Sequence, residues 1–255
     1  MRTIYVFAHQ DDEFAVAAML ARSARHGDEI FCVYLTDGDT RDVVGRTRDD
    51  ESIAVLATLG VARARIAFIG TDLSIPDGHL VRHLDSAYDG LFTFVERIGL
   101  PDRIYTLAWE GGHQDHDAAH LVVAAVATRL GIASRVRQFP IYHGEGIPAP
   151  FFRVLKPLRD LAGVTVEHLG LREAWRNAML CWSYPSQRRT WLGLFPQAFA
   201  RLMTTRRLYS AAIDLDRLAT RPHAGPLLYE RMGRMRYDEF DTYAAPFRAR
   251  TIIEC

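Results

Sequence analysis

Hydrophobic and polar positions along the first half of the chain follow two alternating patterns. Short runs rich in β-branched and aromatic residues, such as TIYVFA and EIFCVYLT, are typical of buried strands. Between them lie longer segments with apolar residues three or four positions apart, each followed by a glycine, as is typical of amphipathic helices. The pattern predicts strands at residues 3–8, 29–36, 65–69, 102–107 and 135–141, and helices at 13–26, 43–59, 79–98 and 116–130.

Strands that alternate with helices predict an α/β fold, with a Rossmann-like and mostly parallel sheet flanked by helices. Beyond Pro148 the alternation loosens. Residues 164–168 predict one more strand and residues 171–182 a helix, and we interpret the rest of this region as helix and loop. We therefore expect one domain over 1–255, with a Rossmann-like core at 1–147. The irregular, helix-rich C-terminal portion at 148–255 is expected to shape the substrate site.

Composition excludes few functions but limits the partners. The net charge is zero with histidine neutral, so no overall field would hold nucleic acid, and we expect no nucleic-acid partner. No stretch approaches the ~18 apolar residues that a membrane span needs. Nothing in the composition decides between a monomer and a homo-oligomer.

Cysteine content indicates the compartment. Cys32, Cys181 and Cys255 are odd in number and show no CxxC spacing, which argues against a disulfide framework and for a reducing environment. The N-terminal apolar run is shorter than the roughly 7–15 residues of a signal-peptide core. We expect a cytoplasmic protein.

Two clusters of histidine and acidic residues directly follow predicted strands. HQDDE at residues 9–13 ends the first strand, and GGHQDHDAAH at residues 111–120 follows the fourth. In the common order of a doubly wound sheet these strands are neighbours where the strand order reverses, and ligands bind beyond their carboxyl ends. The two clusters are therefore expected to face each other across one crevice.

Imidazole and carboxylate without thiolate suit zinc or another divalent first-row ion. His9 and Asp12 are three residues apart at a turn into a helix, and His116 can supply a third ligand. Three protein ligands and an open position are typical of catalytic zinc, which lowers the pKa of its water to about 7. A nearby carboxylate can take a proton from that water, and a nearby histidine can give one to a leaving group.

The first cluster has a simpler interpretation. Asp11 and Asp12 could only cap and charge the N-terminus of the first helix, which is worth roughly 0.5–2 kcal/mol. The second cluster favours the metal interpretation, because two clusters at neighbouring strand ends are a more specific signal than one acidic helix start.

The two clusters resemble the signatures of the LmbE-like N-deacetylases, the family that includes the GlcNAc-phosphatidylinositol de-N-acetylases (PIG-L). AHQDDE is similar to AHPDDE, and GGHQDHDAAH is similar to GHPDHxAxH. RTRDDESIAVLATLGV and REAWRNAMLCWSYPSQ are similar to two further segments of the family, so the resemblance covers most of the chain. It implies a zinc-dependent hydrolase that removes an acetyl group from an amino sugar.

The resemblance also implies roles for individual residues. His9, Asp12 and His116 would bind zinc. Asp11 would be the general base that activates the water. His113 would either protonate the departing amine or stabilise the oxyanion.

Gln10 and Gln114 stand where both family signatures have proline. Proline fixes φ and donates no backbone hydrogen bond, whereas a glutamine side chain can form hydrogen bonds. No expected ligand is lost by these changes, so we expect them to affect the loop shape and the substrate more than the metal.

Two residues of the second cluster have secondary roles. Asp115 is expected either to orient His113 or His116 through a hydrogen bond or to cap the helix. His120 lies one turn after His116 on the same helix face. We expect it to support the ligands rather than to bind the metal.

Two residues outside the clusters are further candidates for substrate binding. Arg48 could hold a substrate anion or be a solvated helix residue. Asp37 follows the second strand, where it could form a turn or bind a substrate hydroxyl.

Together these features predict metal-dependent hydrolysis of an N-acyl group, most simply N-acetyl, from an amino sugar or glycoside by a zinc-activated water. One alternative is an amidase that acts on a thiol conjugate or another non-sugar amide with the same metal site. Another is a non-catalytic nucleotide-binding module on a Rossmann-like sheet. No GxGxxG follows the first strand, and the acidic loop there would repel phosphates.

Overall fold

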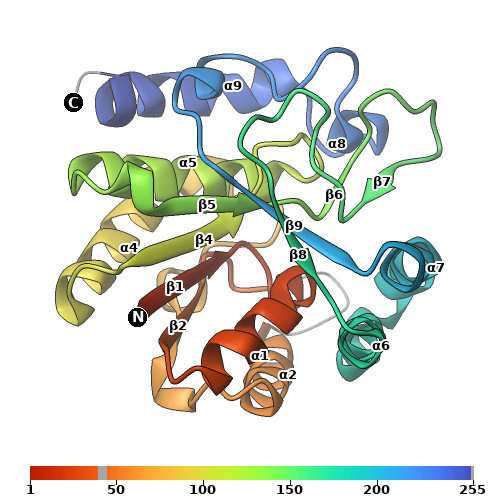
Figure 1. Cartoon of the computed structure of the whole chain (residues 1–255). Coiled ribbons are helices and arrows are strands. Elements are labelled where there is room, and N and C mark those ends of the chain that lie inside the picture. The colour runs from red at the N-terminus through yellow and green to blue at the C-terminus, as the bar shows by residue number, and fades with distance from the viewer. Residues whose placement is uncertain (40–44, 254–255) are drawn as a thin grey trace.

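The computed structural model describes residues 1–39 and 45–253. These residues form a seven-stranded sheet in the order β3-β2-β1-β4-β5-β9-β8 (Figure 1). Its parallel strands are β1 (Arg2–Phe7), β2 (Glu29–Tyr34), β3 (Ile66–Phe68), β4 (Arg103–Leu107) and β5 (Val136–Phe139). The predicted α/β fold is confirmed. Because β1 pairs with β4, the strand order reverses between them.

Central strands are buried on both faces, as a parallel sheet covered by helices requires. Residues 3–7 of β1 are all buried. Tyr5 stacks on Tyr105 of β4 with ring centroids 4.9 Å apart, and Phe7 lies edge-on to Phe139 of β5 at 6.2 Å. These side chains from neighbouring strands form the centre of the hydrophobic core.

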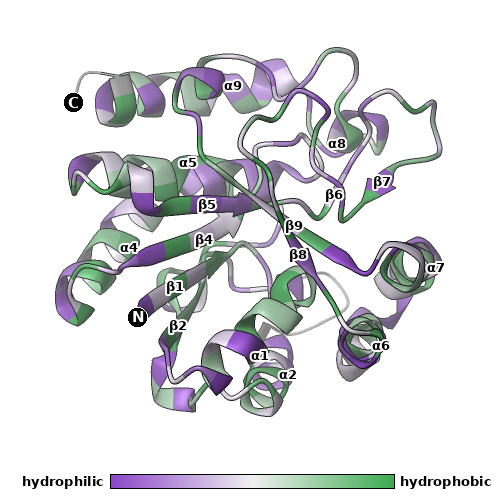
Figure 2. Cartoon of the chain, in the orientation of Figure 1, coloured by the Kyte–Doolittle hydropathy of each residue, from purple (hydrophilic) through white to green (hydrophobic). Residues whose placement is uncertain are grey.

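Helices cover the two faces of the sheet separately (Figure 1). On one side lie α1 (Ala17–Arg25) and α2 (Gly45–Thr58). On the other side α4 (Leu84–Ile98) packs against α5 (Gln114–Arg129), and α9 (Tyr237–Arg248) covers α5 from outside. The outer helices alternate hydrophilic and hydrophobic residues along their length (Figure 2). By contrast, α5 is buried from Gln114 to Ala127, because it lies between the sheet and other helices.

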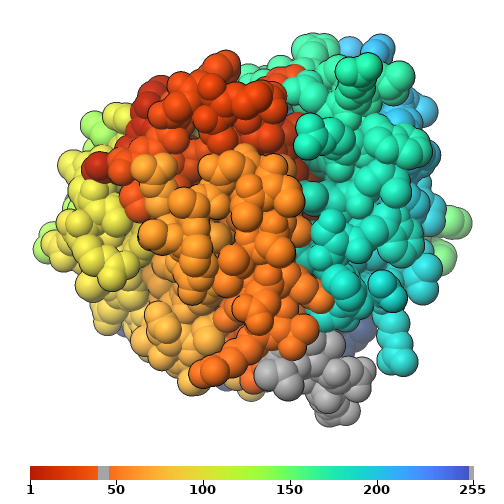
Figure 3. Space-filling view, turned by 90° about the horizontal axis from the view of Figure 1, so that it is seen from below, coloured from red at the N-terminus to blue at the C-terminus, as the bar shows by residue number. Residues whose placement is uncertain are grey.

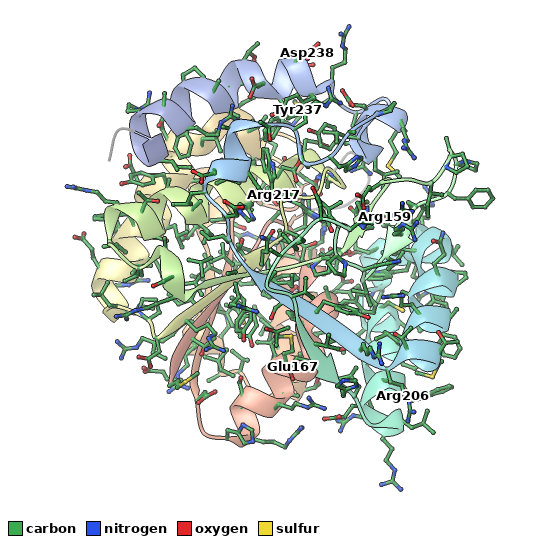
Figure 4. All side chains as sticks on the ribbon, turned by 45° about the horizontal axis from the view of Figure 1, so that its top comes forward. Arg159, Glu167, Arg206, Arg217, Tyr237 and Asp238 are labelled. Carbon is green, nitrogen blue, oxygen red and sulfur yellow. The ribbon has the colours of Figure 1, made fainter. Side chains whose placement is uncertain are left out.

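The C-terminal portion extends the sheet. There β9 (Arg207–Ala212) pairs antiparallel with β5 and with β8 (Thr165–His168). Figure 4 shows Glu167 of β8 and Arg206 next to β9 toward this outer edge. Our interpretation of the region after 182 as helix and loop is wrong for β9. Its sequence, RLYSAA, has little period-two pattern, and pairing with strands distant in sequence determines its structure.

Further short elements complete this portion. Its helices are α6 (Leu171–Met179), α7 (Arg188–Thr205) and α8 (Leu228–Arg231), and β6 (Tyr142–His143) pairs with β7 (Arg153–Val154) in a small second sheet. Figure 3 shows α6 and α7, in teal, beside α1 and α2, in red and orange. Within the described ranges, no helix combines the length and hydrophobicity needed to cross a membrane.

Several helix starts differ from the prediction. The segments before α1 and α4 are 3-10 turns at Asp12–Val16 and Leu80–His83. A five-residue helix, α3 (Ile69–Leu73), directly follows β3. The first two residues of the helix predicted at 43–59, as well as Cys255, lie outside the described residues.

Candidate active site

Both predicted clusters line one cavity of about 260 Å³ beyond the carboxyl ends of β1 and β4. His9, Asp11 and Asp12 come from the loop after β1, while His113 and His116 come from the start of α5. A separate hollow of about 590 Å³ between α1 and α6 contains none of the predicted site residues. The expectation that the clusters face each other across one crevice therefore agrees with the geometry.

The three expected metal ligands form a compact group. His116 Nε2 lies 3.1 Å from Asp12 Oδ1, and His9 Nδ1 lies 3.7 Å from Asp12 Oδ2. Ligands about 2.0–2.2 Å from a tetrahedral ion are about 3.3–3.6 Å from one another. Both distances are close to this range but join different oxygens of Asp12, so the donor chemistry of His9, Asp12 and His116 suits a divalent ion such as zinc, and their role as its ligands stays a prediction.

Other donors lie in the same place. Ring centroids of His9 and His113 are 4.6 Å apart, and His9, His113 and His116 each offer a ring nitrogen within 4.8 Å of the others. His9 forms a second such group with Asp77 and Asp115. His9 belongs to both groups and Asp12 to neither, so His9 is the donor that the two alternatives share.

Two acidic residues contact the Nε2 atom of His9. Its Nε2 lies 3.0 Å from Asp115 Oδ2 and 3.3 Å from Asp77 Oδ1. A carboxylate on the far nitrogen of a metal-binding imidazole fixes its tautomer and orientation. This arrangement leaves Nδ1 of His9 directed toward Asp12 as the nitrogen available to a metal ion.

Asp115 therefore has a different partner from the ones predicted. Its carboxylate contacts His9 rather than His113 or His116. The same carboxylate accepts the backbone N–H groups of Gly78 at 2.6 Å and Leu80 at 3.0 Å. The difference arises because the loop at 77–80 packs over the start of α5, a contact that the local sequence does not reveal.

Opposite charges shift the pKa values of the proposed ligands. Burial would lower the pKa of His9, but the carboxylates of Asp77, Asp115 and Asp12 raise it well above its usual range. Burial would raise the pKa of Asp12, but His116 and His9 lower it. The Asp12 carboxylate also accepts the backbone N–H groups of Ala8 and His9, so it is held in its charged form.

Asp11 differs from Asp12 in both backbone and charge. Its φ of 134° lies in a region that favours glycine, and such strain persists where the surroundings enforce it, often at functional sites. The buried Glu13 carboxylate accepts the Asp11 N–H at 3.0 Å and helps to hold this conformation. Burial raises the pKa of the Asp11 carboxyl to about 8, although the Arg48 guanidinium 3.5 Å away acts to lower it.

His113 caps α5. Its Nδ1 accepts the backbone N–H of Asp115 at 3.2 Å, so the neutral ring carries its proton on Nε2. Burial, together with the charges of His9 and Arg234, lowers the pKa of His113 well below its usual range. His113 is therefore a neutral hydrogen-bond donor within the cavity.

Arg48 is buried rather than solvated. It forms an ion pair with Asp77 at 2.8 Å and donates to the backbone oxygens of Gly38 and Gln10. These contacts tie together loops that follow β1, β2 and β3. Although Arg48 lines the cavity, its charge is already balanced by Asp77 and Asp11.

Besides Asp115, two predicted residues lie outside the residues that line the cavity. His120 is buried farther along α5, where its Nδ1 contacts the Leu107 carbonyl oxygen at 2.8 Å. Asp37 accepts the backbone N–H of Asp39 at 2.8 Å, which is typical of a turn. These contacts favour structural roles for both residues.

The glutamines that replace the family prolines use their side chains. The Gln10 amide donates to Asp49 Oδ1 at 2.7 Å and to the Thr36 carbonyl oxygen at 3.2 Å. The Gln114 amide donates to the Gly78 carbonyl oxygen at 3.3 Å. Each glutamine thus joins a signature loop to a neighbouring loop or helix.

Gln10→Ala is expected to lower the free energy of unfolding by about 1–3 kcal/mol, because it leaves the buried Asp49 without one of its partners. Gln114→Ala removes a single, longer hydrogen bond and should lower the free energy of unfolding by less. Urea unfolding of the two variants at one fixed zinc concentration measures the difference. Equal stability of Gln10→Ala and the unchanged protein would contradict this role.

Gly112 allows a close backbone approach within the second cluster. A Cβ atom there would lie 2.0 Å from the Tyr142 carbonyl oxygen. The glycine is thus needed for close packing between protein segments. The Tyr142 ring also lines the cavity, where its centroid lies 5.4 Å from that of the His116 ring.

Sequence reasoning missed several cavity residues. Asp77 lies in the loop after α3, the short helix that follows β3, so a signal that could have revealed it is an acidic residue in the connection after the third strand. The C-terminal portion contributes residues that no motif marks. These are Thr190, Trp191, Leu194 and Arg234. Gln187 also lines the cavity, and it is the last residue of the quoted segment REAWRNAMLCWSYPSQ.

Comparisons with known proteins agree with this geometry. The family model of PIG-L, GlcNAc-PI de-N-acetylase, matches residues 4–127, which include both clusters. A comparison with curated proteins found no match.

Several solved deacetylases share the fold. A deacetylase of the teicoplanin biosynthesis pathway, in complex with bog, is 17% identical with a TM-score of 0.61, over 83% of this chain and 97% of that one. The A40926 pseudoaglycone deacetylase is 17% identical with a TM-score of 0.61, over 88% and 99%. The N,N'-diacetylchitobiose deacetylase from Pyrococcus horikoshii is 14% identical with a TM-score of 0.53, over 83% and 82%.

These likenesses establish the architecture, while the family model covers the segment that carries the two clusters. The same segment supplies the histidines and the aspartates that lie together in the cavity. The segment at residues 4–127 therefore matches the PIG-L, or LmbE-like, family of metal-dependent deacetylases, which are hydrolases.

Proposed function

We propose that this chain hydrolyses the N-acetyl group of an amino sugar or glycoside, releasing acetate and a free amine. The observation that carries the proposal is the convergence of His9, Asp12 and His116 with Asp11 and His113 in one cavity. The similar deacetylases of teicoplanin biosynthesis and of N,N'-diacetylchitobiose support an acetylated amino sugar as the substrate class.

His9, Asp12 and His116 would hold the metal ion, and zinc suits their donor set. When bound, a divalent ion supplies a Lewis acid that polarises the amide carbonyl and lowers the pKa of water. The charged Asp12 carboxylate and the carboxylate-backed His9 ring are arranged for such a ligand.

Asp11 is the proposed proton carrier. A divalent ion bound beside Asp11 would lower its raised pKa, so that its carboxylate, which lines the cavity with Asp12, would be ionised and would take a proton as the water oxygen attacks the amide carbon. The same carboxyl group then gives this proton to the nitrogen as the C–N bond breaks. Arg48, 3.5 Å from Asp11 Oδ1, keeps the side chain in place between the two transfers.

His113 is proposed to stabilise the oxyanion rather than to protonate the amine. Its Nδ1 is occupied as an acceptor for the Asp115 N–H, so the ring cannot gain a second proton without losing this cap. A neutral ring still donates from Nε2, and a donor aimed at the developing oxyanion is worth about 10²–10³ in kcat.

Removal of metal is expected to abolish deacetylation, and zinc is expected to restore it. The measurement is release of free amine from a panel of N-acetyl amino sugars, with and without chelator. Zinc should be added from below one equivalent upward, because one similar solved structure is a zinc-inhibited form of teicoplanin deacetylase. Hydrolysis that continues unchanged in metal-free protein would contradict the proposal.

The same panel should contain non-sugar amides, including acylated thiol conjugates. Faster zinc-dependent hydrolysis of these amides than of every amino sugar would replace the sugar substrate with the amidase alternative. Asp11→Asn protein, prepared identically, serves as the control for a contaminating hydrolase.

We also propose that residues 148–255 select the substrate. Trp191 and Leu194 of α7, together with Arg234 before α9, line the cavity with residues of the two clusters. They lie beyond the segment that matches the family model. Substrate preference is therefore expected to follow this portion.

A further inference from the structure

Arg234 stands out among the residues that line the cavity. It is exposed, and it borders the same space as His113, His116 and Tyr142. Within residues 1–39 and 45–253, its guanidinium forms no hydrogen bond or ion pair. Its positive charge nevertheless acts on His113 and Tyr142. Arg234 is therefore a cation that borders the cavity and has no side-chain partner among the described residues.

Neighbouring arginines are used differently. Arg48, the other arginine of the cavity, pairs with Asp77 and Asp11. Arg231 donates to the carbonyl oxygens of Gly144, Ile147 and Pro226, and so braces two loops against each other. These guanidinium groups are committed inside the protein, whereas that of Arg234 is available to a ligand.

The backbone fixes the position of Arg234. The N–H of Gly233 bonds to the Glu230 carbonyl oxygen, and the N–H of Arg234 bonds to the Tyr229 carbonyl oxygen. This pair of hydrogen bonds is a Schellman motif, in which the residue after the helix needs positive φ. Gly233 has φ 66°, so α8 ends in a defined turn that presents Arg234.

Both ends of this turn are anchored next to the site. The Glu230 carboxylate accepts the N–H groups of Leu227 and Tyr237, which closes the segment between α8 and α9. The N–H of Leu228 bonds to the Gly111 carbonyl oxygen at 2.8 Å, which ties the segment to the loop that carries His113. Figure 4 labels Tyr237 and Asp238, where α9 begins directly after this turn.

We propose that Arg234 forms an anion subsite at the cavity, which binds a carboxylate or phosphate group carried by the substrate outside the acetamide. A planar guanidinium fork matches these two anions, and its hydrogen bonds to them are stronger than those between neutral groups. This inference rests on the proposed function, since it names a charged class within the same amino-sugar substrates.

Binding of product-like ligands tests the subsite without turnover. Three probes share the glucosamine ring and differ in the anomeric substituent, which is anionic in two of them and neutral in the third: glucosamine 1-phosphate, the carboxymethyl glucosaminide and the methyl glucosaminide. Calorimetry with zinc-supplemented protein measures the affinity of each probe. We expect the better anionic probe to bind roughly tenfold more tightly than the methyl glycoside, as one partly exposed charged hydrogen-bond pair would provide.

Variants assign that preference to one side chain. Arg234→Met should bring the ratio of anionic to neutral affinity close to one, and Arg234→Lys should retain part of it, because lysine keeps the charge without the fork. Arg236→Met is the matched control. Arg236 is exposed, lies two residues away, pairs with Asp238 and is not among the cavity residues. Its removal should leave the ratio unchanged.

The outcomes separate the subsite from the proposed function. An anionic preference that survives Arg234→Met would place the anion on the metal and overturn the subsite, as would equal or absent binding of all three probes. A preference for phosphate or for carboxylate that depends on Arg234 supports the subsite and identifies the anion. Such binding without any hydrolysis of acetylated sugars would contradict the proposed function alone.

Discussion

Asp11→Asn is expected to lower kcat by about 10²–10⁴-fold, the typical contribution of a positioned acid–base group. Asparagine has nearly the shape of aspartate but cannot accept the proton of the attacking water. The variant should still bind one equivalent of zinc, because the proposed ligands His9, Asp12 and His116 remain. Steady-state kinetics together with metal analysis of the purified variant measure the two properties separately.

A matched control is Asp37→Asn. Asp37 follows the neighbouring strand β2, accepts a backbone hydrogen bond within its own turn and is not among the cavity residues. The Asp37→Asn variant should have a kcat within a few-fold of that of the unchanged protein. If Asp11→Asn kept full turnover, the proton would have to move through another group, and Asp11 would lose its proposed role.

His116→Ala should abolish zinc binding and, with it, activity. His116 Nε2 is 3.1 Å from Asp12 Oδ1, so its removal takes away one of three ligands from the centre of the proposed site. The loss of affinity should exceed the 10–100-fold that typically follows removal of an outer partner of a ligand. Alanine suits the helix, so circular dichroism should show a folded protein.

His120→Ala provides the comparison on the same helix. It removes an equally buried histidine, one turn along, whose Nδ1 contacts the Leu107 carbonyl oxygen. We expect this variant to be less stable but to bind zinc with unchanged stoichiometry. Loss of zinc in His120→Ala, with retention in His116→Ala, would reverse the assignment.

The sequence was sufficient for the parallel strands β1 to β5 and for the meeting of the two clusters. Continuous apolar runs marked β1 and β4 as buried strands, and parallel topology then placed the residues after them at one edge. The topology alone therefore predicted that the site residues of the two loops lie close together, without knowledge of their side-chain positions. A histidine farther along α5, such as His120, could be distinguished from the proposed ligands only once the geometry of the helix was known.

Tertiary contacts explain what the sequence did not reveal. The position of Asp77 depends on how the loop after β3 packs over α5. The partner of Asp115 depends on the same packing, which brings its carboxylate to His9 instead of a histidine on its own helix. Arg234 reaches the cavity from more than a hundred residues beyond His116, through a turn that is itself anchored to Gly111.

Strand β9 was missed for a related reason. Apolar and polar residues do not clearly alternate in β9, and alanine, which occupies positions 211 and 212, favours helices. The strand forms because β5 and β8 both offer open edges, which lie far away in the sequence. Local pattern cannot anticipate pairing that is decided by distant partners.

A crystal structure of the protein grown with zinc, with anomalous data at the zinc edge, tests the central claim most directly. We predict one ion within about 2.0–2.2 Å of a ring nitrogen of His9, a carboxylate oxygen of Asp12 and a ring nitrogen of His116, with a remaining position open to the cavity. An ion held instead by His9, Asp77 and Asp115, or no ion near His9 at all, would contradict this account.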